Sequence, residues 1–93
     1  VDLKKDIKIK NLKKVLKKKY FKSRFVKILK TDTPISTNDV INTNNCYIAI
    51  CKSKYKNKVI IISAIDNLIK GGAGQAIQNM NLKFKFPITK GLL

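Results

Sequence analysis

The sequence predicts an α+β fold in which two helices pack on a partial, largely antiparallel sheet. Three observations predict it. Two nearly continuous apolar segments, at residues 46–51 and 59–65, are joined by a short polar link, which is typical of a β-hairpin. A Lys-rich stretch upstream repeats its apolar residues at helical spacing. Downstream, a turn with three of the four glycines introduces a second helix.

The first half of the chain contributes a helix between two strands. Residues 1–4 are expected to end a strand, and Asp6 to cap a helix over residues 7–20. Lysines surround one side of this helix, and its apolar residues fall on a narrow opposite face: Leu12, Val15, Leu16 and Tyr20. Residues 24–29 predict a strand. Residues 30–45 predict a loop with a short strand near residues 39–41, because Pro34 and many Thr, Asn and Asp residues favour turns.

The predicted hairpin contains both cysteines. Cys46 and Cys51 are five residues apart, which on a strand places them on opposite faces, so they cannot pair with each other. The chain has no His and no metal-ligand spacing, so we expect no metal site. Buried free thiols are typical of a reducing cytosol, and the predicted location is therefore cytoplasmic.

The second helix is predicted over residues 74–84, since Pro87 prevents its easy extension, and residues 88–93 form an irregular tail. A sheet of about three or four strands would leave strand edges and apolar faces uncovered. We therefore expect further protein to cover them. Val1 stands where a complete protein would have Met, so we interpret the chain as the cut end of something longer.

The charge of the chain favours polyanions without specifying one. The formal net charge is +16, from 21 basic and 5 acidic residues, but Arg24 is the single arginine. Proteins that read bases depend on the planar fork of Arg, so we expect no specific nucleic-acid partner and attribute the lysines to AT-rich codon usage. A small basic nucleic-acid-binding module and a non-functional gene remnant are the alternative hypotheses. No apolar run approaches the ~20 residues that span a bilayer, so no membrane partner is expected.

The glycine-rich turn is the candidate ligand site. Gly71 and Gly72 tolerate positive φ and let a ligand approach the backbone closely. The helix that follows would begin with exposed N–H groups, which favour a phosphate or a polarised carbonyl. Asn67, at the end of the strand, offers the donor and the acceptor that recognise a carboxamide. The alternative is a plain strand-to-helix turn, because glycines most often serve as turn residues.

Residues 66–82 carry a distinctive order: Asp66-Asn67-Leu68-Ile69-Lys70-Gly71-Gly72-Ala73-Gly74-Gln75-Ala76-Ile77-Gln78-Asn79-Met80-Asn81-Leu82. This segment resembles the signature near the carboxy terminus of the N-acetyl-gamma-glutamyl-phosphate reductases. Upstream, Tyr20 with residues 25–29, and residues 44–48, are similar to further family positions. Gln75 favours this family over the aspartate-semialdehyde dehydrogenases, which usually carry Asn there. Lys85 and Ile88 depart from the family pattern.

The resemblance implies that residues 1–93 are the carboxy-terminal fragment of the dimerisation and catalytic domain of a glyceraldehyde-phosphate-dehydrogenase-like enzyme, with the Rossmann NADP domain outside this chain. These enzymes reduce N-acetyl-glutamyl phosphate to the semialdehyde in arginine biosynthesis. As the resemblance implies, a Cys thiolate attacks the acyl carbon, phosphate leaves, and NADPH reduces the thioester. That Cys and an acid–base His lie upstream in the family, so no catalytic residue is expected here and the fragment alone is expected to be inactive.

The resemblance also implies a set of cofactor contacts. Asn67 would meet the nicotinamide carboxamide of NADP(H), and Lys70 offers a charge for a phosphate. The remaining contacts would line the cofactor or acyl-phosphate side through their backbone: Gly71, Gly72, Ala73, Gly74 and Gln75. The cofactor and the acyl-phosphate substrate would be bound together with the missing domain, in a homo-oligomer.

Overall fold

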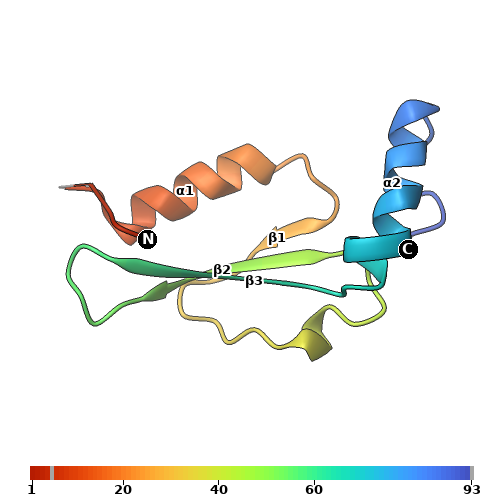
Figure 1. The fold of residues 1–93 in the computed structure, drawn as a ribbon. Helices are drawn as coiled ribbons and strands as arrows, with labels where there is room; N and C mark the ends of the chain where they lie inside the picture. Colours follow the sequence, from red (N-terminus) through yellow and green to blue (C-terminus); the bar gives the residue numbers. More distant parts are fainter. Residues whose placement is uncertain (5, 93) are drawn as a thin grey trace.

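The computed structural model describes residues 1–4 and 6–92. Their regular elements follow the order α1 (Ile9–Tyr20), β1 (Val26–Ile28), the 3₁₀ helix η1 (Thr37–Asp39), β2 (Cys46–Lys52), β3 (Val59–Ile65), the π-helical turn η2 (Ile69–Ala73) and α2 (Gly74–Lys83). Helix α1 lies along one face of the sheet, and α2 projects from the end of the sheet opposite the β2–β3 turn (Figure 1). The α+β class predicted from the sequence is therefore confirmed.

The predicted hairpin is confirmed. Strands β2 and β3 pair antiparallel over their whole length, from Cys46↔Ile65 to Lys52↔Val59. The polar residues between them make the turn, as the composition of this link predicted. The hairpin is the longest continuous pairing in the sheet, and it carries the chain to the candidate site at residue 66.

The prediction of a largely antiparallel sheet is wrong for β1. This strand pairs parallel to β2, with Val26 opposite Cys46 and Ile28 opposite Ile48, in a sheet of order β1-β2-β3. A parallel pair needs a crossover of a dozen or more residues, and the long connection between Ile28 and Cys46 supplies one. The length of this loop was the feature of the sequence from which the parallel pairing could have been predicted. The strand is also shorter than predicted, since residues 24–25 and 29 lie outside it.

The connection between β1 and β2 contains a 3₁₀ helix where a short strand near residues 39–41 was expected. Ser36 caps η1 in a capping box with Asp39, whose Oδ2 accepts from the Ser36 N–H at 2.8 Å. This local pairing satisfies the backbone within the loop, so no strand partner is needed. Val40, directly after η1, is fully buried.

Helix α1 begins at Ile9, two residues later than predicted, and Asp6 does not cap it. Asp6 has a φ of 70°, in the left-handed region, whereas the N-cap position is taken by Lys8 without a side-chain cap. The predicted apolar face is also partly wrong, because Val15 is 63% exposed. Helix α1 packs mainly against β1 and β2.

The core is small, and β3 lies largely outside it. The buried apolar residues are Phe25, Val40, Ala49, Ile50 and Val59. The sequence predicted that both hairpin strands are of the buried type, but only Val59 of β3 is buried. Apolar side chains are nevertheless exposed on both faces of this strand: Ile60, Ile61, Ile62 and Ile65. The expectation of bare apolar surface is confirmed, and its location on β3 follows from the position of β3 at the sheet edge.

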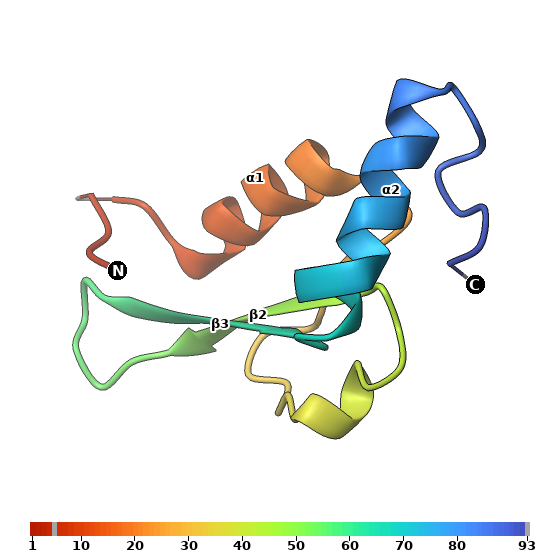
Figure 2. The same ribbon diagram turned by 45° about the vertical axis from the view of Figure 1, so that its right-hand side comes forward.

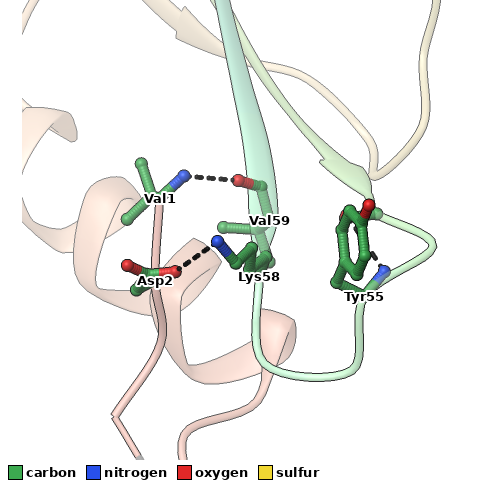
Figure 3. A network of polar contacts seen from close by, with 6 residues as sticks. Val1, Asp2, Tyr55, Lys58 and Val59 are labelled. Atoms are coloured by element: carbon green, nitrogen blue, oxygen red, sulfur yellow. Dashed lines mark hydrogen bonds and ion pairs between the residues drawn. The ribbon is translucent and has the colours of Figure 1, made fainter.

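The start of the chain pairs with the outer edge of β3 (Figure 3). The Val1 amine donates to Val59 O at 2.9 Å, and the Val59 N–H donates to Val1 O at the same distance. Asp2 forms an isolated antiparallel bridge with Lys58, and their charged groups are 3.3 Å apart. The prediction that residues 1–4 end a strand is thus met by a single bridge rather than by a regular strand.

The tail after α2 folds back along the helix (Figure 2). Asn81, which is fully buried, donates from Nδ2 to Ile88 O at 3.1 Å and to Lys90 O at 3.0 Å. The predicted irregular tail over residues 88–93 is confirmed up to residue 92, and Leu93 lies outside the described residues. No helix in the described part of the chain has the length and apolarity to cross a membrane.

Candidate functional site: an amide-bearing turn at the end of the sheet

The glycine-rich segment forms a π-helical turn that leads directly into α2. We call Ile69–Ala73 the π-turn. Its wide hydrogen bonds include Gly71 N–H to Asp66 O at 3.1 Å and Ala73 N–H to Leu68 O at 3.0 Å. The Gly74 N–H, at the start of α2, donates to Ile69 O. The N–H of Gly74, the first residue of α2, is therefore paired within the fold.

Asp66 caps the entrance to the π-turn. Its Oδ1 accepts from the N–H groups of Leu68 at 2.8 Å and Ile69 at 3.3 Å, and its Oδ2 accepts from Asn42 N–H at 2.8 Å. These hydrogen bonds, first those from Asn42 and Leu68, hold the pKa of the Asp66 carboxyl below its ordinary value. The carboxylate is therefore charged at neutral pH.

Asn67 is exposed and lies over Gly71. A Cβ on Gly71 would lie 2.9 Å from Asn67 Oδ1 and 3.3 Å from Ile65 Cδ1. Glycine at position 71 therefore leaves room for the Asn67 amide to fold against the turn. The result is an open amide at the end of the sheet, on a backbone fixed by the Asp66 cap.

The other predicted contacts divide into exposed and buried positions. Gly71, Gly72 and Ala73 are exposed, and Gln75 is half-buried with its Nε2 donating to Asn79 Oδ1 at 3.1 Å. Gly74 is buried, because its Cα faces Asn44 Oδ1 and Ile69. Gly71, Gly72 and Ala73 are therefore open to solvent, whereas Gly74 is a packing position.

Lys70 is half-buried and contacts Gln78 and Phe25. Its Nζ donates to Gln78 Oε1 at 2.7 Å and lies 5.4 Å from the centroid of the Phe25 ring. Burial lowers the pKa of the Lys70 ammonium, and the nearby Cys46 thiol opposes this shift. In this structure the Lys70 ammonium is bound to Gln78, and its contact with a phosphate stays a prediction.

Cys46 and Cys51 are both free, as predicted, but each is half-buried, whereas buried thiols were expected. Burial raises the pKa of the Cys46 thiol, and Lys70 only partly offsets this effect. A raised pKa keeps the sulfur protonated and poorly nucleophilic at neutral pH, which confirms the inert thiol predicted from the apolar strand. No group of three His, Cys, Asp or Glu residues suited to a metal ion occurs within residues 1–4 and 6–92.

The fold is thus an α+β segment that leaves the isoleucines of β3 and the turn at Asn67 exposed. Residues 1–67 match the family model described as "Semialdehyde dehydrogenase, dimerisation domain". The chain belongs to this family.

Named relatives extend the likeness over nearly the whole chain. It is 54% identical over 92 residues to the N-acetyl-gamma-glutamyl-phosphate reductase of Vesicomyosocius okutanii, covering 99% of this chain and 26% of that protein. Identity is 45% over 92 residues to the reductase of the same name from Halothermothrix orenii, with the same coverage. The probable chloroplastic reductase of Arabidopsis thaliana is 37% identical over 93 residues, which are all of this chain and 23% of that protein. These matches confirm the resemblance, and the chain spans about a quarter of the length of these curated relatives.

Proposed function

We propose that this chain is the segment of an N-acetyl-gamma-glutamyl-phosphate reductase that presents Asn67 to the nicotinamide of NADP(H). The observation that carries the proposal is the placement of an exposed amide on a rigid, capped turn at the end of the sheet. The names of the relatives support the reaction, which is reduction of N-acetyl-glutamyl phosphate to the semialdehyde in arginine biosynthesis. The cytoplasmic location stays part of the proposal.

The chemistry divides between this segment and the rest of the enzyme. The cofactor, when bound, supplies the hydride. Asn67 can donate from Nδ2 to the carboxamide oxygen and accept at Oδ1 from the carboxamide nitrogen, which fixes the rotation of the ring. The small residues Gly71, Gly72 and Ala73 leave space beside it. The nucleophile and the acid–base group belong to the rest of the enzyme, because Cys46 is held protonated and the chain contains no His.

A second copy of this segment is proposed as the partner that covers β3. Ile60 and Ile62 are 50% and 41% exposed, and Ile61 and Ile65 on the opposite face are 39% and 41% exposed. Neighbouring apolar side chains left bare on both faces of an edge strand are typical of an interface. The family description names a dimerisation domain, which supports a homo-oligomer.

A chimera tests the proposed function. The matched quarter of the 54% identical relative is replaced by this chain, and oxidation of NADPH is followed with the acyl phosphate. We expect turnover that depends on both the acyl phosphate and NADPH, with a mass in light scattering of at least two chains. A folded chimera without activity would contradict the reductase assignment and favour the gene-remnant hypothesis, and a monomer would contradict the role of β3.

The nucleic-acid hypothesis is tested on the same chimera. The lysines of α1 are mostly exposed and carry no acidic partner in its first turn, so counterion attraction to any polyanion is expected at low salt. Binding that persists at near-physiological salt would revive the alternative. The reported family and relatives name enzymes and give it no support.

A further inference from the structure

Gln78 joins three separate parts of the fold beneath the π-turn. Its Oε1 accepts from Lys70 Nζ at 2.7 Å and from Asn44 Nδ2 at 2.9 Å. Lys70 belongs to the π-turn, Gln78 to α2, and Asn44 to the connection that enters β2. A single carbonyl oxygen therefore holds the turn, the helix and the sheet together.

The surroundings of Gln78 allow few other arrangements. Asn44 is 1% exposed, and Phe25, whose ring faces the Lys70 ammonium, is 2% exposed. The Asn44 side chain also lies against the Cα of Gly74, where a Cβ would collide with Oδ1. Hydrogen bonds to a charged donor in such a site are stronger than neutral ones, so loss of the acceptor would leave an ammonium and an amide unpaired.

The network continues to Asn67 through two short steps. Lys70 is followed by Gly71, whose N–H donates to Asp66 O at 3.1 Å. The Asn67 side chain rests over Gly71, since a Cβ there would lie 2.9 Å from its Oδ1. A rotation of the turn at Lys70 would thus displace the surface that supports the Asn67 amide.

We infer that Gln78 is a positioning residue, which sets the orientation of Asn67 toward the cofactor by hydrogen bonding Lys70 and Asn44. This inference rests on the proposed function. It assigns Lys70 to the interior of the protein, and it assigns the Gln78 acceptor a role in cofactor use.

The test is a double-mutant cycle in the chimera with Gln78→Leu and Asn67→Ala. We expect Gln78→Leu to lower kcat/KM for NADPH roughly tenfold, as loss of a charge-assisted hydrogen bond would, while KM for the acyl phosphate stays unchanged. In the Asn67→Ala background the same substitution is expected to have little further effect, because both act on one contact. Gln78→Glu keeps an acceptor for Lys70 and should restore most of the loss.

Control variants distinguish a failure of the positioning role of Gln78 from a failure of the cofactor contact of Asn67. Asn11→Leu replaces an exposed amide on α1 and should leave the kinetics unchanged. Lys70→Met removes the donor from the other side and should resemble Gln78→Leu, which keeps the test available if Gln78→Leu does not fold. Independent, multiplicative effects of Gln78→Leu and Asn67→Ala would overturn the positioning role alone. Absence of any effect from Asn67→Ala would overturn the cofactor assignment, and the positioning role with it.

Discussion

Replacing Asn67 with Ala in the chimera is expected to lower kcat/KM for NADPH about tenfold while folding stays intact. The substitution removes one donor and one acceptor for the carboxamide. A net hydrogen bond contributes about 0.5–1.5 kcal/mol, so two bonds of about 0.7 kcal/mol each account for a tenfold loss. The side chain is exposed, which is why little stability should be lost. Steady-state kinetics with varied NADPH, and a thermal melt, measure the two quantities.

Leu68→Ala is the matched control for this experiment. Leu68 is the next residue along the chain and is 76% exposed, so its truncation changes the same surface without removing an amide. We expect its kinetics with NADPH to match the unsubstituted chimera. Equal kinetics for both variants and the unsubstituted protein would show that Asn67 does not contact the cofactor.

Gly74→Ala is expected to destabilise the chimera by about 1–3 kcal/mol, the range for overpacking a close-packed site. An added Cβ would lie 2.6 Å from Ile69 O and 2.7 Å from Ile69 Cγ2, and it would also collide with Asn44 Oδ1. Backbone atoms cannot move aside cheaply, so this clash outweighs the gain of up to ~1 kcal/mol that Ala normally brings to a helix. Denaturant unfolding measures the difference.

Gly71→Ala provides the comparison for Gly74→Ala, since it is the same substitution three residues earlier. Its Cβ would meet the Asn67 amide, which is the mobile end of a side chain and can rotate away. We expect nearly unchanged stability and reduced use of NADPH, because the amide is displaced. An equal loss of stability at both positions would contradict the distinct roles assigned to the two glycines.

The sequence was sufficient where a local pattern determined the structure. The hairpin followed from two apolar segments and a polar link, and α2 followed from Gly74 and the position of Pro87. The direction of β1 relative to β2 was not determined by any local sequence pattern. The parallel pairing of β1 depends on the path of the long loop that contains Val40, and the apolar content of β3 could not show that its residues would remain uncovered.

The candidate site was only partly predictable. Asn67 and the glycines were identified from the sequence because their residue types alone indicate a possible ligand contact: an amide both donates and accepts, and small residues leave space. The roles of Asn44 and Gln78 depend on three segments meeting in space, and Asn44 carried no periodic signal in the sequence. The Asp66 cap could have been expected, since Asp commonly occupies the residue before a helical turn.

A crystal structure of the chimera with NADPH bound tests the central claim most directly. Our account predicts that the Asn67 amide lies within hydrogen-bonding distance, about 3 Å, of the nicotinamide carboxamide, with the ring beside Gly71 and Gly72. A nicotinamide seated elsewhere, with Asn67 directed into solvent, would contradict it.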